Sequence, residues 1–361
     1  GVWIMAYTTI DDPSLHFRIK TYTGNSTNDT AYTWDETHAD MQPDWLWFKN
    51  RSENQSHAIF DSIRGATLRL IPNETGAEGT ENTNLDSFDS NGFTVDNELI
   101  VNGSSDNMVA WGWKGGGSAS SNSDGDITSS VSVNQTAGFS IVSYTGSGTI
   151  GNTVGHGLGA TPAWIITKNR DASSQWITWH QGGTSTKNMD LSTAEAEYDS
   201  SASGWQQGIN NVPTSSLLRF TAGSHGNNNV MDSSEKYISY VFVEKQGYSK
   251  FGNYEGNGNA DGPFIYLGFR PAWCMFRNTT GDKWSIYDAK RSPSNVVDDN
   301  IRANQSNAEV DQADKEVDFL SNGIKIRTSS GEWNGNGNNI VFYAFAESPF
   351  INSSGVPCNA R

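Results

Sequence analysis

Apolar and polar residues alternate along much of the chain with a period of two, as in the stretches WITWH (176–180) and IKIRT (324–328). This is the period of a β-strand that buries one of its faces. Asn-Gly dipeptides at Asn91 and Asn322 separate apolar stretches, and both residues of such a pair tolerate the positive φ of a tight hairpin turn. Helical periodicity is weak, and only residues 192–201 are compatible with one or two helical turns. The pattern predicts short antiparallel strands joined by polar turns.

The spacing of these strands and the composition both favour an all-β protein. Strands and turns that recur roughly every ten residues are typical of antiparallel sandwiches. The chain has 13 Trp, 12 Tyr, 16 Phe and 37 Gly, which suit pleated, turn-rich structure better than helices. Its 361 residues exceed the size of one ordinary core, so several domains are expected. We predict an all-β fold of antiparallel β-sandwich domains of the jelly-roll or lectin-like kind.

Three segments share the pattern Pro-x-Trp, an apolar run, Lys or Arg followed by Asn, a polar turn and a second aromatic strand. They begin PDWLWFKNR at Pro43, PAWIITKNR at Pro162 and PAWCMFRNT at Pro271, so the copies are 119 and 109 residues apart. Similarity at such a spacing indicates repeated domains. The predicted role of the three prolines is structural, because each fits the start of a strand. The rings predicted to lie in the core are Trp45, Trp47, Trp164 and Trp273.

Three further landmarks keep the same order in every unit. The first is Tyr-x-Gly, found at 22–24, 144–146 and 254–256. The second is Asn/Asp-x-Ser/Thr-x-Ala-Glu, found at 73–78, 190–195 and 304–309. The third is an aromatic closing strand, found at 108–114, 237–245 and 340–347. An ordered set of this kind predicts three tandem copies of one domain.

These landmarks divide the chain into units and connections. The predicted divisions are an N-terminal arm or closing strand of a preceding unit (1–17), unit one (18–114), a linker (115–138), unit two (139–247), unit three (248–350) and a C-terminal tail (351–361). The linker is predicted from its Gly, Ser and Asn content. Residues 4–7 are similar in character to a closing strand, which leaves both interpretations of the first segment open.

Units one and three share a charged pair at the end of the second aromatic strand. The pairs are Asp61-x-x-Arg64 and Asp288-x-x-Arg291, whereas unit two has His180 in this region. A residue that recurs in several units usually stabilises the fold that the units share. We therefore predict that both pairs are internal, charge-assisted links at strand ends.

The same acids could also serve as catalytic groups. A polysaccharide depolymerase needs two carboxylates about 5 to 10 Å apart across a cleft, and Asp61 with Glu78 or Asp288 with Glu309 could be arranged in this way. A catalytic pair is needed once, however, and these acids recur. The sequence favours a protein that is not an enzyme.

Metal, cofactor and disulfide signals are weak. The six His residues are scattered and lack the spacing of zinc ligands. The acidic loop Asp124-Gly125-Asp126 lacks the ordered oxygen ligands of a calcium loop and is expected to be solvated. No metal and no cofactor is predicted. Cys274 and Cys358 could form one bridge, but Cys274 lies in an apolar run and is expected to be a buried hydrophobic residue.

The charge of the chain bears on its partners. Its net charge is -16, from 24 Lys and Arg against 40 Asp and Glu, with no basic cluster. Nucleic acid binding depends largely on basic residues, so direct binding is not expected. No apolar run reaches the roughly 18 to 20 residues of a membrane span.

Two tryptophans stand apart from the strand pattern and are glycan-contact candidates. Trp205 lies in SASGWQQGINN and Trp333 in SGEWNGNGNN, both rich in Gly and Asn. Flat aromatic faces flanked by polar groups suit sugar recognition, and loops commonly carry binding residues. The sequence predicts these two side chains as ligand-binding residues.

Several long motifs resemble a known kind of protein. The segments YTGN, QPDWLWFKNR, FDSIRGA, MVAWGWK, VGHGLGATPAWIITKNR, DGPFIYLGFRPAW and YAFAESPF, in this order, cover most of the chain. Together they resemble tandem-repeat β-domain virion structural proteins of tailed phages, especially marine phages, of the tail-fibre, spike or appendage type. No catalytic residues come with this resemblance.

The resemblance implies a function and a location. It implies a virion subunit that is assembled in the cytoplasm of the host bacterium and forms homo-oligomers. Its implied partners are other virion proteins and host surface polysaccharide. We therefore expect a host-facing appendage protein that binds glycan. The alternatives are a purely architectural virion protein, such as a capsid decoration or tail-assembly component, and a polysaccharide depolymerase.

Overall fold

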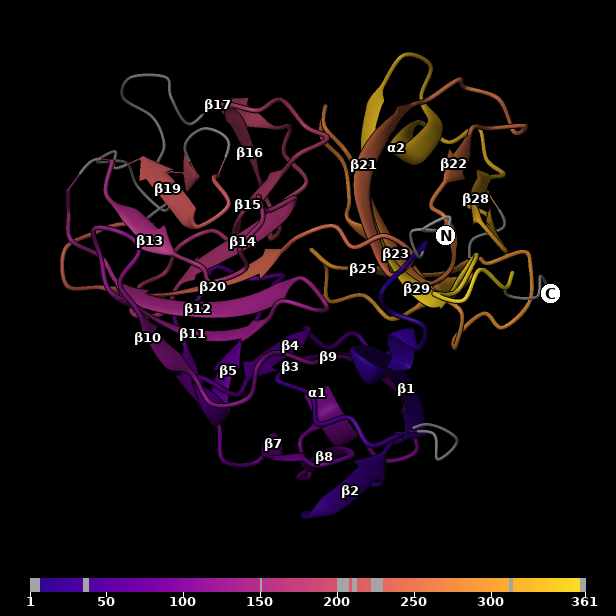
Figure 1. Ribbon diagram of the computed structural model, residues 1–361. Helices are drawn as coiled ribbons and strands as arrows, with labels where there is room; N and C mark the ends of the chain where they lie inside the picture. Colours follow the sequence, from indigo (N-terminus) through magenta and orange to yellow (C-terminus); the bar gives the residue numbers. More distant parts are fainter. Residues whose placement is uncertain are drawn as a thin grey trace.

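The computed structural model describes residues 7–34, 39–149, 151–199, 208–209, 213–221, 230–311 and 314–357. The prediction of an all-β fold is confirmed, because the described residues form several antiparallel sheets and only three short helical turns. Figure 1 shows three lobes, with the first repeat at the bottom, the second at the upper left and the third at the upper right.

The first repeat forms two sheets. Its elements are η1 (Pro13–Leu15), β1 (Phe17–Thr23), β2 (Thr30–Thr33), β3 (Trp45–Asn50), β4 (Ala58–Asp61), β5 (Gly65–Leu70), β6 (Gly79–Thr80), β7 (Leu85–Asp89), β8 (Gly92–Val95), α1 (Leu99–Asn102) and β9 (Asn107–Trp113). The large sheet has the order β1-β9-β3-β4-β5-β6, and the small sheet has the order β2-β8-β7. The predicted hairpin at Asn91 joins β7 to β8, with Gly92 at a φ of 137°.

The third repeat has the same strand order as the first. Its elements are β21 (Ser249–Glu255), β22 (Phe264–Tyr266), β23 (Phe269–Asn278), β24 (Ser285–Asp288), β25 (Asp299–Arg302), β26 (Val310–Asp311), β27 (Val317–Leu320), β28 (Gly323–Ile326), α2 (Gly331–Asn334) and β29 (Asn339–Pro349). The large sheet is β21-β29-β23-β24-β25-β26 and the small sheet is β22-β28-β27. The predicted hairpin at Asn322 joins β27 to β28.

The second repeat has two additional strands. Its elements are β10 (Ser120–Asn122), β11 (Ser129–Asn134), β12 (Phe139–Thr145), β13 (Thr153–Gly155), β14 (Trp164–Asn169), β15 (Ile177–His180), β16 (Lys187–Asp190), β17 (Tyr198–Asp199), β18 (Gly208–Ile209), β19 (Leu217–Thr221) and β20 (Lys236–Phe242). The large sheet has the order β10-β11-β12-β20-β14-β15-β16-β17, and the small sheet β13-β19-β18.

Two sequence predictions in this repeat are wrong. Residues 115–138 are not a linker, because β10 and β11 lie within them and extend the large sheet of the second repeat. The helical turn considered at 192–201 does not form over its described residues, which are turn and extended chain ending in β17. The predicted unit starts at 18, 139 and 248 fall within one residue of the first residues of β1, β12 and β21.

The strand that opens with Trp45 is buried on both faces. All six residues of β3 are buried. Trp45 and Trp47 belong to one apolar cluster, whereas Leu46 and Phe48 belong to another. Neighbouring residues of a strand point to opposite sides of the sheet. The continuous apolar run therefore reflects a sheet that separates two cores.

One of these cores is shared by the three repeats. The largest apolar cluster takes residues from all three, while each of the other three clusters lies within one repeat. The ring of Trp45 stacks on Tyr240 of the second repeat at 4.6 Å between centroids. Trp113 contacts Trp273 of the third repeat at 5.9 Å, and Trp164 contacts Tyr343 at 4.6 Å. The three large sheets thus enclose one common interior, and the repeats are not independent domains.

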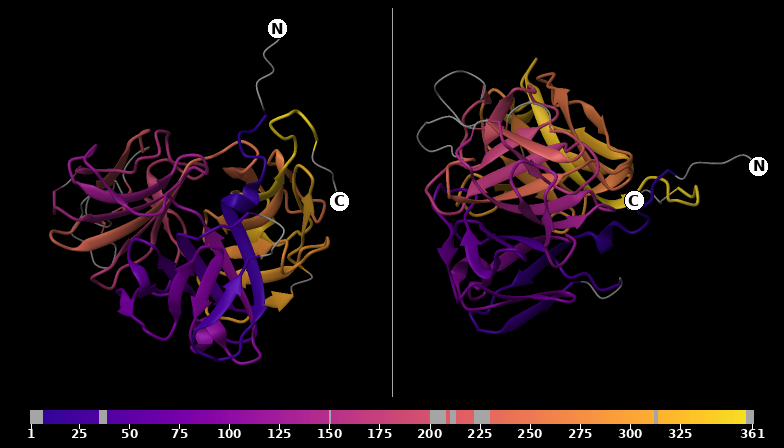
Figure 2. Two further views of the ribbon diagram at one scale, coloured as in Figure 1. Left: turned by 60° about the horizontal axis from the view of Figure 1, so that its bottom comes forward. Right: turned by 60° about the vertical axis from the view of Figure 1, so that its left-hand side comes forward.

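The N-terminal segment lies against the third repeat and the turn that leads into it. The Tyr7 hydroxyl donates to the Gly268 carbonyl at 3.0 Å, and the Thr8 hydroxyl donates to the Gln246 carbonyl at 2.7 Å. Ile10 enters the shared core. Figure 2 shows the segment that leads into β1, in indigo, beside the third repeat, in orange and yellow. Over its described residues, the segment 1–17 is an arm that joins the first repeat to the third.

Candidate functional site

The structure describes only one of the two tryptophans that are predicted to contact glycan. Trp333 is 0% exposed and lies in α2. Its ring stacks on Phe276 at 6.1 Å and meets Tyr287 edge-on at 5.1 Å. The prediction that Trp333 contacts a sugar is wrong, because the polar loop folds into a helical turn that directs the indole inward. Trp205 lies outside the described residues.

The rings and prolines predicted to be structural lie in the core strands. Each of the four predicted core tryptophans is 0% exposed, which confirms their burial: Trp45, Trp47, Trp164 and Trp273. Pro43 and Pro162 each stand two residues before a strand. Pro271 lies inside β23, where the pairing with β29 shifts register. Such irregularities accommodate a residue that lacks an amide hydrogen.

The Tyr-x-Gly landmark closes each repeat on itself. The hydroxyls of Tyr22, Tyr144 and Tyr254 donate to the carbonyls of Val101, Val230 and Trp333, at 2.5, 2.7 and 2.6 Å. The following glycines lie against backbone, where a Cβ on Gly24, Gly146 or Gly256 would come within 2.3 Å of a carbonyl oxygen. Any other residue would therefore clash at this position. The landmark is architectural.

The charged pairs of the first and third repeats are buried ion clusters. Arg64 Nε lies 2.5 Å from Asp61 Oδ2, and both side chains are 0% exposed. Arg64 Nη1 also lies 3.1 Å from Glu78. Burial alone would lower the pKa of Arg64, but the Asp61 carboxylate and its neighbours raise it above its ordinary value. The guanidinium therefore stays charged, and the predicted internal link is confirmed.

The third repeat repeats this arrangement. Arg291 lies 2.5 Å from Asp288 and 2.7 Å from Glu309. The pKa of Arg291 is also raised: burial would lower it, and the Asp288 carboxylate more than offsets this. Both carboxylate pairs considered as catalytic groups are thus held by arginines. They are not arranged across an open cleft as glycoside hydrolysis requires.

The same clusters join one repeat to the next. Glu78 makes a bidentate contact with Arg170 of the second repeat, with both distances 2.9 Å. Glu309 contacts Arg51 of the first repeat at 2.6 Å. Glu78, Glu309 and Glu197 also donate their backbone amides to carbonyls of the next repeat, at 2.8, 2.9 and 2.9 Å. The contacts run from the first repeat to the second, to the third and back to the first, so the repeats form a closed ring.

This ring corrects one alignment made from the sequence. The Glu197 amide binds the Thr279 carbonyl, as the Glu78 amide binds the Arg170 carbonyl. Glu197, and not Glu195, is therefore the counterpart of Glu78 and Glu309. The carbonyls that bind a ring nitrogen of the neighbouring repeat, those of Ile71, Asp190 and Arg302, each stand seven residues before these glutamates. The landmark of the second repeat therefore lies at 192–197, and the pattern at 190–195 only imitates it.

A second set of contacts crosses the repeats nearer the centre. The Tyr240 hydroxyl donates to Asp61 Oδ2 at 2.8 Å, and the Trp111 indole donates to Asp288 Oδ2 at 3.0 Å. In the second repeat His180 takes the place of the Asp and packs on Tyr343 at 4.5 Å. Burial lowers the pKa of His180 to about 3, so the ring is neutral there at ordinary pH.

The basic residue of the Lys/Arg-Asn landmark also lies at these junctions. Lys168 is 0% exposed, and its ammonium donates to the carbonyls of Asn169 at 2.8 Å and of Thr75, in the first repeat, at 3.1 Å. Lys49 binds turn carbonyls in the first repeat. Arg277 in the third repeat binds the Glu195 carbonyl of the second. The landmark therefore satisfies turn carbonyls with a buried cation.

This burial predicts a pH-dependent stability. Burial lowers the pKa of Lys168 to about 7 from its ordinary 10.5. Between these values the unfolded chain binds more protons than the folded one, so the contribution of Lys168 to stability rises with pH and is lost as pH falls towards 7. In urea unfolding from pH 7 to 10, the stability of the unchanged protein relative to Lys168→Met should rise by roughly 1 kcal/mol per pH unit. Parallel pH profiles for the two proteins would contradict this.

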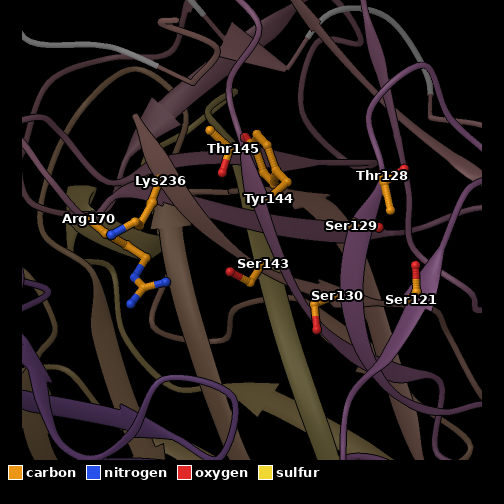
Figure 3. Close-up of a pocket in the computed structure, with 9 residues that line it drawn as sticks. All are labelled: Ser121, Thr128, Ser129, Ser130, Ser143, Tyr144, Thr145, Arg170 and Lys236. Atoms are coloured by element: carbon orange, nitrogen blue, oxygen red, sulfur yellow. The ribbon is translucent and has the colours of Figure 1, made fainter. Parts of the chain in front are cut away.

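A polar pocket of about 380 Å³ lies on the second repeat. Figure 3 shows Arg170 and Lys236 on one side, hydroxyl groups on the other and Ser143 between them. The residues that line it are Ser121, Thr128, Ser129, Ser130, Ser143, Tyr144, Thr145, Arg170 and Lys236. Hydroxyls and cations of this kind can bind a small polar ligand. Sequence reasoning missed this pocket because four of its residues lie in the segment assigned as a linker.

Two further observations limit the chemistry of the described residues. They contain no group of three or more His, Cys, Asp or Glu placed to hold a metal ion. None of the helices in the described part of the chain has the length and apolarity needed to span a membrane. Among the described residues Cys274 is a free, buried thiol in β23, as expected from its apolar surroundings, whereas Cys358 lies outside them.

Comparisons with known proteins bear on the family. No curated protein and no solved structure matches the chain. One family model, described as Domain of unknown function (DUF7483), matches residues 12–349, which run from the N-terminal arm through the last strand of the third repeat. Since this match takes in all three repeats, the chain belongs to the DUF7483 family.

Proposed function

We propose that the chain is a non-enzymatic virion structural protein of a tailed phage, and that it belongs to a host-facing appendage that binds cell-surface glycan. The observation that supports this proposal most strongly is the structural role of the residues that recur in the repeats. The repeated aromatics fill cores, and the repeated acids and arginines form the junctions between repeats. Recognition is therefore left to surfaces that differ between the repeats.

The polar surface of the second repeat supports this proposal. The pocket of Figure 3 has hydroxyls and the Lys236 ammonium, which suit the hydroxyl or carboxylate groups of a sugar. It is formed partly by β10 and β11, which the other two repeats lack. We further propose that each repeat is a sandwich-type unit derived from one ancestral copy, and that the protein assembles with other virion proteins as a homo-oligomer.

Three measurements test this function. The position of the protein in a virion reconstruction should lie on a tail appendage. The purified protein should block adsorption of the phage to its host in a dose-dependent way. Incubation with host polysaccharide should release no reducing sugar. A position in the capsid lattice without adsorption blocking would favour the architectural alternative, and sugar release would favour a depolymerase.

A further inference from the structure

Two aromatic side chains on the third repeat are exposed to solvent. Phe264 is 47% exposed and Tyr266 is 49% exposed, whereas Ile265 between them is 6% exposed. All three belong to β22, which is an edge strand of the small sheet, at the right of Figure 1. Residues two apart on a strand point to the same side, about 7 Å from each other. The two rings therefore lie next to each other on the outer face of the sheet.

The neighbouring strand β28 places a glycine beside the two rings. Across the sheet, Phe264 pairs with Lys325 and Tyr266 pairs with Gly323. A Cβ on Gly323 would lie 2.1 Å from the Ile265 carbonyl oxygen and 3.0 Å from the Phe264 ring. The backbone therefore requires glycine here, as it does at Gly92 of the first repeat. Because Gly323 has no side chain, the Phe264 ring can lie close to it.

Polar groups surround the two rings. The Tyr7 hydroxyl lies 3.3 Å from the Tyr266 hydroxyl, and the Lys250 ammonium lies over one face of the Tyr266 ring, 5.5 Å from its centre. On the other side, Lys325 pairs with Asp261 at 2.6 Å, and the Asp261 side chain is 83% exposed. The surface thus combines an apolar centre with hydrogen-bonding groups at its edge.

The other repeats do not carry these rings. In the first repeat Ala31 and Thr33 flank the inward-pointing Tyr32, as Phe264 and Tyr266 flank Ile265. In the second repeat the residues beside the buried Val154 are Thr153 and Gly155. The shared architecture therefore forms without aromatics at these positions. Exposed rings that the fold does not need indicate a binding surface.

We propose that Phe264 and Tyr266 form a platform on which a pyranose ring of a glycan stacks, with its hydroxyls held by Lys325, Asp261 and Tyr7. A sugar has apolar ring faces and a polar rim, which matches this surface. Two half-exposed side chains are far smaller than the roughly 800 Å² per partner of a standard protein interface. An anionic membrane would be repelled by the net charge of -16. This inference rests on the glycan binding proposed above and locates it.

The chain supplies its own test variant. Phe264→Ala with Tyr266→Thr gives the third repeat the side chains of the first, and both positions are exposed, so folding should be preserved. Binding of the full chain to an array of bacterial surface oligosaccharides should weaken at least tenfold, while the melting temperature stays unchanged. Tyr266→Phe, which keeps the ring, should retain most of the binding. The control Leu99→Ala removes an apolar side chain that is 50% exposed on the first repeat and should bind as the unchanged protein does. Lys236→Ala tests the polar pocket of the second repeat as the competing site.

The outcomes separate this inference from the proposed function. If the unchanged protein binds glycans and the double variant binds them equally well, the platform is wrong and glycan binding stands. If only Lys236→Ala loses binding, the polar pocket is the glycan site and the platform is again wrong. If the unchanged protein binds no oligosaccharide and does not block adsorption to host cells, the proposed glycan binding itself is wrong.

Discussion

Arg291→Met is expected to lower the free energy of unfolding by about 3–5 kcal/mol. Arg291 is buried between Asp288 and Glu309 and also donates to the carbonyls of Ile286 and Asp299, at 3.0 and 2.9 Å. Its removal leaves the Asp288 carboxylate buried without its cation, and leaves the carbonyls of Ile286 and Asp299 without this donor. Urea unfolding at neutral pH measures the loss.

Arg51 provides a matched control. It binds the same Glu309 carboxylate, but its side chain is 18% exposed and it has no buried Asp partner. Arg51→Met should cost about 1 kcal/mol or less, as partly exposed pairs do. The double change Asp288→Asn with Arg291→Met should recover part of the stability lost by Arg291→Met. Equal, small losses for Arg51→Met and Arg291→Met would show that the buried cluster does not hold the junction.

Trp45→Ala should lower the free energy of unfolding by about 3–5 kcal/mol. The ring is 0% exposed and contacts Trp113 at 4.5 Å and Tyr240 of the second repeat at 4.6 Å. Because the core is shared, we expect the whole chain to melt at a lower temperature, and not the first repeat alone. Intrinsic fluorescence and far-UV circular dichroism during one thermal scan should give the same midpoint.

Phe264→Ala is the control for this change. It also removes an aromatic ring, but one that is 47% exposed and outside every core cluster. Exposed substitutions of this kind usually change stability by less than about 0.5 kcal/mol. If Trp45→Ala left the second and third repeats with their original midpoint, the shared core would not couple them.

Much of the fold could be predicted from the sequence because the local signals agree. Asn-Gly turns at Asn91 and Asn322 form the expected hairpins. The spacing of Pro43, Pro162 and Pro271 gives three copies of one core strand. The recurrence of Asp61 and Arg64 at Asp288 and Arg291 predicted a structural pair, since recurring residues serve what the repeats have in common.

The shared core could not be predicted in the same way. A continuous apolar run such as Trp45–Phe48 indicates burial on both faces, but it does not reveal what covers the second face. Residues 115–138 were assigned as a linker because Ser, Gly and Asn dominate them. They form strands because β11 pairs with β12 through backbone amide and carbonyl groups, which are present whatever the side chains are.

The candidate site was harder to predict than the fold. The polar neighbours of Trp333 predict an exposed ring, but one helical turn buries it. Phe264 and Tyr266 were missed because the segment FIY looks like an ordinary core strand. Superposing the repeats would have identified them, since the first repeat has Ala31 and Thr33 at the same positions. Whether a side chain is exposed depends on which face of its sheet is covered by other elements, and the local sequence does not indicate this.

The central claim is that three sequence repeats form one folding unit around a common interior. Differential scanning calorimetry of the whole chain tests it most directly. We predict a single transition whose calorimetric enthalpy equals its van't Hoff enthalpy. Separate transitions for the repeats, with a calorimetric enthalpy near three times the van't Hoff value, would contradict the account.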